Sequence, residues 1–145
     1  MSISGKLIEL GKLLFSSMAT WKFYKYGFDL NDSNISTLAT AIAGSAGTIL
    51  GFLITAIALM ASVMDRDLLK NLRSTGGYRV LISGSFICAG LFLLLLALSL
   101  SLLLPWANHK DILLLCTIFI GALAGVNLIT TGIGFYRVIL SISKK

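Results

Sequence analysis

Residues 38–64 read LATAIAGSAGTILGFLITAIALMASVM, and none of these 27 residues carries a charge. At about 1.5 Å of rise per residue, a helix of this length can cross the roughly 30 Å hydrocarbon core of a membrane. Residues 80–104, VLISGSFICAGLFLLLLALSLSLLL, form a second such run, and residues 112–136, ILLLCTIFIGALAGVNLITTGIGFY, form a third. The sequence therefore predicts an all-α integral membrane protein with three transmembrane helices.

The composition of the whole chain agrees with this prediction. Of its 145 residues 57% are hydrophobic and 12% are charged, and the mean hydropathy is +0.92. In a water-soluble protein, three uncharged helices of this length would leave too little polar surface to cover them. The chain shows no internal repeat and no linker between two parts, so we expect residues 1–145 to form a single membrane domain.

A different pattern precedes the first apolar run. On a helical projection of residues 3–25, one face carries apolar side chains and the other carries polar ones. The apolar face holds Leu7, Leu10, Leu14, Met18 and Trp21, and the polar face holds Lys6, Glu9, Lys12, Ser16 and Thr20. We expect an amphipathic helix at the membrane surface, which either lies among the lipid headgroups or packs on partner subunits. The polar segment 29–36 is expected to separate it from the first span.

The orientation of the spans is predicted from the Lys and Arg residues near their ends. The connection 65–79 and the tail 137–145 lie on one side of the membrane and hold most of these cations: Arg66, Lys70, Arg73, Arg79, Arg137, Lys144 and Lys145. Because cytoplasmic loops carry an excess of Lys and Arg, we expect a protein of the bacterial inner membrane with connection and tail in the cytoplasm. The cations of the connection either serve only as this flank or also contact anionic lipid headgroups or an acidic partner.

The sequence contains no pattern typical of catalysis. Metalloprotease, nucleotide-binding and Ser-His-Asp patterns are absent, and no two carboxylates are paired within an apolar run. Cys88 and Cys116 lie in apolar runs without neighbouring metal ligands, so they are interpreted as packing residues. We expect a protein that is not an enzyme, binds no cofactor or metal and makes no direct contact with nucleic acid.

Small residues recur at regular spacing within two of the apolar runs. Membrane helices associate through close backbone approach, because lipid is as apolar as another helix. The first run carries a stripe at every fourth position, Ala39, Ala43, Gly47, Gly51 and Thr55, and the third carries Gly121 and Gly125. These stripes predict helix-packing faces, which mate either within one chain or between chains. We favour a homo-oligomer, because two such faces in three spans exceed what a compact monomer needs.

Asn127 is the most polar side chain within any of the three runs. A buried amide without a hydrogen-bond partner is costly, so a partner is expected among Thr130 and Thr131 nearby or Thr48 and Thr55 on the first span. Asn127, Thr130 and Thr131 are therefore the candidate buried polar residues. Two interpretations stay open, a hydrogen bond that stabilises helix packing and the lining of a pore.

Several residues resemble those of the RexB-like family, which are small inner-membrane phage-exclusion proteins, and of related membrane components of anti-phage systems. The resemblance covers about residues 38–145 and rests on Ala46-Gly47-Thr48 in the first span and on Lys70, Leu72-Arg73 and Gly77-Tyr78 in the basic connection. It implies an abortive-infection effector that stays silent in healthy cells. When a partner signals infection, such an effector compromises the inner membrane.

The functional prediction is accordingly an oligomeric membrane component of a bacterial anti-phage defence system. It would perturb membrane integrity or potential, or anchor a cytoplasmic partner protein encoded in the same operon. A holin-like pore-forming protein is one alternative, because three spans, short loops and a basic tail suit that class. A non-catalytic assembly subunit of a larger membrane complex is another, with the small-residue stripes as its docking faces.

Overall fold

The computed structural model describes residues 3–26, 31–62, 77–104 and 110–143. Over these ranges the secondary structure is helical throughout and comprises α1 (Ile3–Tyr26), α2 (Asp32–Ser62), α4 (Gly77–Leu103) and α5 (Lys110–Ser143). Segments of α2, α4 and α5 are long and apolar enough to cross a membrane: Asp32–Leu59, Leu81–Leu103 and Lys110–Arg137. The prediction of an all-α protein with three helices that could span a membrane is confirmed.

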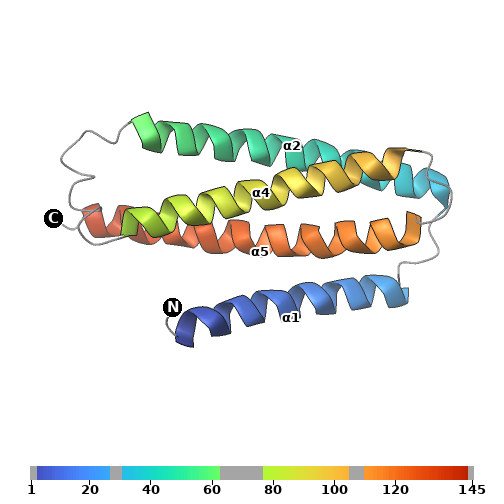
Figure 1. The fold of residues 1–145 in the computed structure, drawn as a ribbon, viewed down its shortest axis with the longest axis horizontal. Helices are drawn as coiled ribbons and strands as arrows, with labels where there is room; N and C mark the ends of the chain where they lie inside the picture. The colour runs from blue at the N-terminus through green and yellow to red at the C-terminus, as the bar shows by residue number, and fades with distance from the viewer. Residues whose placement is uncertain (1–2, 27–30, 63–76, 105–109, 144–145) are drawn as a thin grey trace.

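The helices lie side by side in the order α2, α4, α5, α1, and neighbours along the chain run in opposite directions (Figure 1). Packing follows this order, since α2 contacts α4, α4 contacts α5 and α5 contacts α1. Ile3, Ser62, Gly77 and Ser143 lie at one end of the bundle, hereafter the Ser62 end. The opposite end, where α2 and α5 begin, is the Asp32 end.

The first span begins earlier than the sequence predicts. Segment 29–36 was expected to interrupt the helices, yet α2 starts at Asp32, so that expectation is wrong from Asp32 onward. The carbonyl oxygen of Asn31 accepts hydrogen bonds from the backbone N–H groups of Asn34 (2.8 Å) and Ile35 (3.1 Å). The Asp32 carboxylate also suits the positive end of the helix dipole. This early start places Ile35 in the core, where it is buried.

The other bounds also differ from those of the apolar runs. Within the predicted connection 65–79, residues 65–76 lie outside the described residues, and α4 begins at Gly77. Helix α5 starts two residues before the third run and continues to Ser143, so residues 137–143 of the predicted tail are helical. The helices thus extend past the apolar runs, because hydrogen bonding along a helix does not stop where hydrophobicity does.

Helix α4 is the central element and presents one buried seam. Seven of its buried side chains are separated alternately by four and three positions: Leu81, Ser85, Cys88, Phe92, Leu95, Ser99 and Leu102. This is the heptad spacing of left-handed helix packing, which most membrane bundles also use. Ala89, next to Cys88, is also buried. Three of the seven side chains are Ser or Cys, which lets the neighbouring backbones approach closely.

Partners from both neighbouring helices meet this seam. Ala46 and Leu53 of α2 and Ala124 of α5 join its middle in one apolar cluster. A second cluster lies toward the Asp32 end and contains Ile35, Ala39, Leu102 and Leu114. The outward sides carry large exposed hydrophobic side chains, for example Phe52, Phe86 and Ile129. Apolar residues on both the inside and the outside of a bundle suggest a membrane protein, whose outer face contacts lipid.

Helix α1 lies lengthwise along α5 (Figure 1). Its side toward α5 includes Lys12, which is half-buried, and Ser16, which is fully buried. The predicted apolar face, from Leu7 to Trp21, is exposed, but so are Ile8, Leu13 and Phe15. An amphipathic helix at a membrane surface is therefore not shown by the structure, and that assignment stays a prediction.

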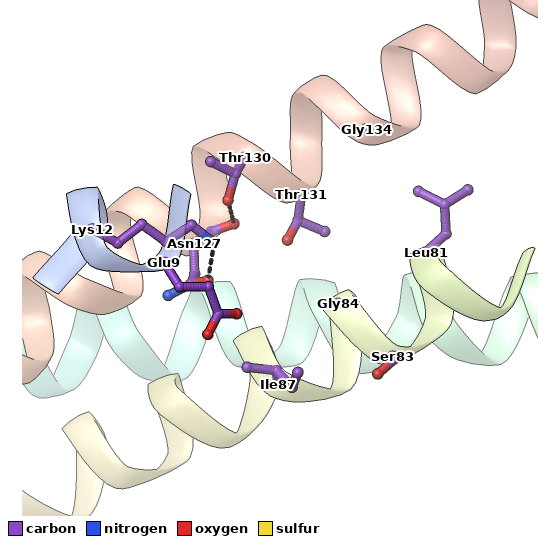
Figure 2. Close-up of a pocket in the computed structure, with 10 residues that line it drawn as sticks. All are labelled: Glu9, Lys12, Leu81, Ser83, Gly84, Ile87, Asn127, Thr130, Thr131 and Gly134. Carbon is purple, nitrogen blue, oxygen red and sulfur yellow. Dashed lines mark hydrogen bonds between the residues drawn. The ribbon is translucent and has the colours of Figure 1, made fainter. Parts of the chain in front are cut away.

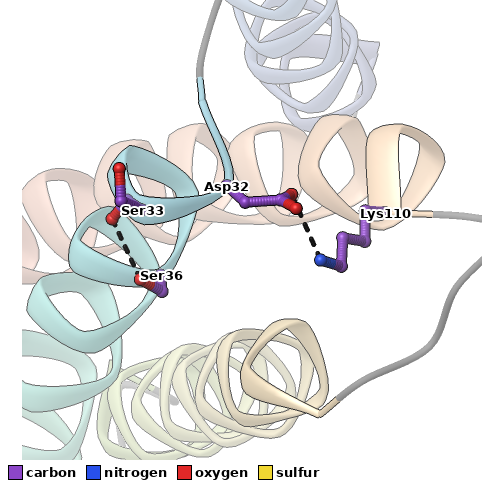
Figure 3. A network of polar contacts seen from close by, with 4 residues as sticks. All are labelled: Asp32, Ser33, Ser36 and Lys110. Atoms are coloured by element: carbon purple, nitrogen blue, oxygen red, sulfur yellow. Dashed lines mark hydrogen bonds and ion pairs between the residues drawn. The ribbon is translucent and has the colours of Figure 1, made fainter.

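At the Asp32 end, an ion pair joins the first turns of α2 and α5. Lys110 Nζ lies 3.1 Å from Asp32 Oδ1 (Figure 3). Close by, the Ser36 hydroxyl donates a hydrogen bond to the Ser33 carbonyl oxygen at 2.9 Å. Because the Asp32 side chain is 79% exposed, the ion pair contributes little stability in water. It does bring the starts of two spans to the same level.

Candidate functional site

A groove of about 590 Å³ lies between α1, α4 and α5 (Figure 2). Its lining residues belong to the first halves of α1 and α4 and to the second half of α5, so the groove lies in the half of the bundle near the Ser62 end. We call it the polar groove. Its lining comes from all three helices: Glu9 and Lys12 from α1, Leu81, Ser83, Gly84 and Ile87 from α4, and Asn127, Thr130, Thr131 and Gly134 from α5. Charged, amide and hydroxyl groups thus gather beside a helix that could span a membrane.

A hydrogen bond between two side chains of the groove joins α1 to α5. Lys12 Nζ donates a hydrogen bond of 2.8 Å to Asn127 Oδ1, although the two residues are 115 positions apart in the chain. Hydrogen bonds with a charged donor are roughly twice as strong as neutral ones. The side-chain partner of Asn127 in the structure is therefore Lys12, rather than one of the threonines that the sequence suggested. Thr48 and Thr55 instead donate to carbonyl oxygens of their own helix, α2.

Helix α5 holds Asn127 in position through its own backbone. Asn127 Nδ2 donates to the Leu123 carbonyl oxygen at 2.9 Å, which leaves Oδ1 directed at Lys12. The Thr130 hydroxyl donates to the backbone carbonyl oxygens of Val126 and Asn127, each at 3.0 Å. These bonds orient both groups without help from Lys12, so the amide oxygen is a preorganised acceptor.

Hydroxyl residues also shape the side of α1 that faces α5. The Ser16 hydroxyl donates to the Lys12 carbonyl oxygen at 2.9 Å, and the Thr20 hydroxyl donates to the Ser16 carbonyl oxygen at 2.9 Å. Hydroxyls that satisfy themselves locally behave as small packing residues. The fully buried Ser16 thus lets α1 approach α5 closely enough for Lys12 to reach Asn127. Elsewhere on α5, Thr117 is also fully buried and donates to the Leu113 carbonyl oxygen at 2.8 Å.

A second charge enters the groove one turn from Lys12. Glu9 lies on the Ser62 side of Lys12 and is exposed. No described residue forms a hydrogen bond or ion pair with its carboxylate. On the facing helices, Gly84 and Gly134 leave room for the groove: a Cβ at Gly84 would lie 3.8 Å from Thr131 Oγ1, and one at Gly134 would lie 3.4 Å from Leu81 Cδ2.

The groups that line the groove can form hydrogen bonds and ion pairs with a bound molecule. A lysine ammonium has three donors, and Asn127 accepts only one of them. Glu9 supplies a negative charge, and Thr131 supplies a hydroxyl. No group of three or more His, Cys, Asp or Glu side chains that could hold a metal ion occurs in the described part of the chain. The groove can hold water, small ions or a polar group of another molecule.

The structure divides the small-residue stripe of α2 between two environments. Ala39 is fully buried, and Ala43 and Gly47 are half-buried. A Cβ at Gly47 would lie 3.3 Å from Leu96 Cδ1 of α4, so the helices approach closely there. Gly51 and Thr55 are exposed, and a Cβ at Gly51 would meet nothing within 4 Å. The first part of the stripe thus packs against α4, and the second part is free for another contact.

The remaining predicted positions are distributed along α5 and α4. A Cβ at Gly121 would lie 3.5 Å from Leu95 Cδ1, whereas one at Gly125 would meet nothing within 4 Å. Asn127, Thr130 and Thr131 all line the polar groove, so the structure brings these three together. Of the predicted lipid or partner contacts, Arg66, Lys70 and Arg73 lie outside the described residues, and Arg79 lies in the first turn of α4.

Sequence reasoning did not assign Glu9 and Lys12 to this site. Both were interpreted as the solvated face of a surface helix, because charges beside an apolar face usually contact water. The spacing of the polar residues did allow this assignment: Glu9, Lys12, Ser16 and Thr20 lie on one side of the helix. Such a polar side can face water, or it can pack against a polar residue of a transmembrane helix. Asn127 was the residue that needed such a partner.

Comparison of the chain with protein-family models, curated proteins and solved structures finds no match.

Proposed function

We propose that the protein is a non-catalytic component of the bacterial inner membrane that alters membrane permeability or potential as part of an anti-phage system. The single observation that carries this proposal is the hydrogen bond between Lys12 and Asn127 inside the polar groove. Ionisable side chains at membrane depth are expensive and usually serve ion pathways or switches. The anti-phage setting comes from the RexB-like resemblance, which supports the proposal from the sequence alone.

In this proposal, the structure corresponds to a closed form in which α1 covers the groove. Apolar burial adds little to helix association in lipid, so the polar contact between Lys12 and Asn127 contributes much of what holds α1 on α5. When the contact breaks, α1 moves to the membrane surface as the amphipathic helix predicted for residues 3–25, and its lysines reach the headgroups. The polar side chains of α5 are then uncovered.

The proposed placement has the connection 65–79 and the C-terminus in the cytoplasm, where the cations of the connection contact anionic lipid or a cytoplasmic partner protein. Such a partner would report infection and shift α1 from one position to the other. A ligand can shift this equilibrium only by binding the two forms with different affinity, so the partner must contact a surface that changes when α1 moves.

The test is phage infection of bacteria that express the protein together with its neighbouring genes. Wild type is expected to lower phage plating and to depolarise the membrane only after infection, as a potential-sensitive dye reports. Lys12→Met and Asn127→Leu are expected to depolarise uninfected cells, because both remove the contact that holds α1. The matched control is Ile129→Leu, which alters an exposed residue two positions away from Asn127. Membrane levels of each variant are measured by immunoblot.

Unchanged plating and potential during infection would contradict the proposal. Abrupt killing by expression alone, in the presence of a muralytic enzyme, would instead indicate the holin-like alternative, in which timed oligomerisation suffices. Slow or absent killing under those conditions would argue against a holin.

A second candidate function, that of an assembly subunit, is favoured by the exposed part of α2. Gly44 and Gly51 are exposed, and a Cβ at either position would meet nothing within 4 Å. Small residues on a free face of a membrane helix suit close approach by a further helix, from a second copy or from another protein. A homo-oligomer that stays intact when the protein is purified alone would favour self-association over assembly with another subunit.

A further inference from the structure

We propose that the polar groove is an aqueous vestibule, which admits water and small hydrophilic solutes from the membrane side at the Ser62 end and ends at Lys12 and Asn127. This inference depends on the proposed crossing of the membrane by α5. It does not depend on the anti-phage role.

The lining residues place the groove in one half of the bundle. Gly134 and Leu81 lie nearest the Ser62 end, and Asn127 and Lys12 lie farthest from it (Figure 2). At about 1.5 Å per residue, Asn127 is roughly 15 Å along α5 from Arg137, where the apolar segment ends, and roughly 25 Å from Lys110, where it begins. The groove therefore reaches from one membrane face almost to the middle of a bilayer about 30 Å thick.

The charges at the inner end require hydration. Asn127 accepts one hydrogen bond from the Lys12 ammonium, which leaves two donors without a partner among the described residues. Glu9 is likewise without a polar contact in the described part of the chain. An unpaired charge in hydrocarbon costs several kcal/mol, whereas water in a cavity supplies the missing partners. Two charges of opposite sign on adjacent turns of α1 are thus accounted for by water in the groove.

The groove has the size and lining that water needs. One water molecule occupies about 30 Å³ in the liquid, so a volume of about 590 Å³ holds many. Ser83 and Thr131 place hydroxyls along the walls between the mouth and Lys12. Buried water is stable only where it finds two or more polar partners, and these side chains provide them. The apolar residues Leu81 and Ile87 form the rest of the α4 wall.

Toward the Asp32 end, the lining of the groove stops at Lys12 on α1 and at Asn127 on α5. One turn beyond Lys12, Ser16 is fully buried, and its hydroxyl donates to the Lys12 carbonyl oxygen at 2.9 Å, so it does not offer its proton to a water molecule. The vestibule therefore ends inside the bundle in this form, with the Lys12 ammonium at its inner end.

Accessibility of single cysteines to a membrane-impermeant thiol reagent tests this inference. The background is the full chain with Cys88→Ser and Cys116→Ser, reconstituted in vesicles of defined orientation. Thr131→Cys lies on the groove wall, and its matched control Ile129→Cys lies on an exposed apolar side of the same helix. Because the reactive species is the thiolate, which forms in water and not in lipid, Thr131→Cys should react at least about tenfold faster than Ile129→Cys. This difference is expected with a methanethiosulfonate reagent added at the Ser62 end, and not when it is added at the Asp32 end.

A second cysteine position keeps the test informative if Thr131→Cys does not fold. Thr130→Cys lies one residue away on the same groove and should give the same side-dependent reaction. Labelling after denaturation in detergent shows that every cysteine is present and reduced. Reaction of Thr131→Cys and Thr130→Cys at the rate of Ile129→Cys, whether all slow or all fast, would overturn the vestibule. Since no phage or neighbouring gene enters this experiment, its failure is distinct from failure of the proposed function.

Discussion

At the scale of single residues, Lys12 and Asn127 form a contact of moderate strength. A lysine combined with an aspartate would form an ion pair whose separation in lipid costs far more than that of a charged group from a neutral amide. Here the partner is the neutral Oδ1 of Asn127, which Nδ2 holds in place through the Leu123 carbonyl oxygen. A contact of this kind suits the proposed function, in which α1 is held on α5 and later released.

The strength of this contact can be measured by changing Asn127 alone. Asn127→Leu should lower the free energy of unfolding in detergent micelles by about 1 kcal/mol, the usual size of a hydrogen bond between membrane helices. Asn127→Asp should raise it, because the carboxylate pairs with the Lys12 ammonium. Denaturation in mixed micelles gives both values, and Ile129→Leu is the control with no expected change. Equal stabilities of Asn127→Leu and this control would show that the contact does not stabilise the fold.

At the scale of helices, the sequence predicts the spans well and their pairing poorly. Length and absence of charge are what a membrane demands of a helix, so the three apolar runs could be identified directly. A helix that is apolar on all sides does not mark which side faces its neighbour. Only small residues mark it, and the spacing of Ser85, Cys88 and Ser99 on α4 did carry that information.

One half of the polar site, on α5, could be predicted from the sequence, whereas the half on α1 could not. An amide within a span stands out, so Asn127 and its neighbouring threonines could be singled out from the sequence. Lys12 could not be assigned to it, because a lysine at the membrane surface and one turned toward a span produce the same helical pattern. Their contact joins positions 115 residues apart, and only the packing of α1 along α5 brings them together.

Substitutions at two glycines of α2 test packing inside the chain and packing between chains separately. Gly47→Leu should weaken the contact of α2 with α4 and lower stability in micelles by about 1–3 kcal/mol, because Leu96 Cδ1 lies only 3.3 Å from the new Cβ. Gly51→Leu should leave that stability unchanged, since a Cβ there meets nothing within 4 Å. If α2 binds a second copy, Gly51→Leu should still reduce the oligomer size in cross-linking or light scattering. A loss of stability in Gly51→Leu as large as that of Gly47→Leu would contradict this division.

At the scale of the whole molecule, the alternating helix directions put both termini of the described chain at the Ser62 end (Figure 1). The opposite end carries the ion pair of Asp32 and Lys110, which are charges of opposite sign. The Ser62 end adjoins the connection and the tail, which hold most of the cations. In the proposed orientation, the end with most of the cations faces the cytoplasm, as the positive-inside rule predicts, and the polar groove opens on the same side.

This arrangement predicts where reporters fused to the chain will be active. A green fluorescent protein attached after Lys145 should fluoresce, and alkaline phosphatase attached there should be inactive, because the positive-inside rule predicts a cytoplasmic location for this end. Phosphatase inserted between residues 104 and 110 should be active, since the start of α5 lies at the opposite end of the bundle. Replacing Arg137, Lys144 and Lys145 by Gln should lower the fraction of correctly oriented chains. Active phosphatase after Lys145 of the unaltered chain would show that the orientation is opposite to the proposed one. The groove would then open to the outside of the cell.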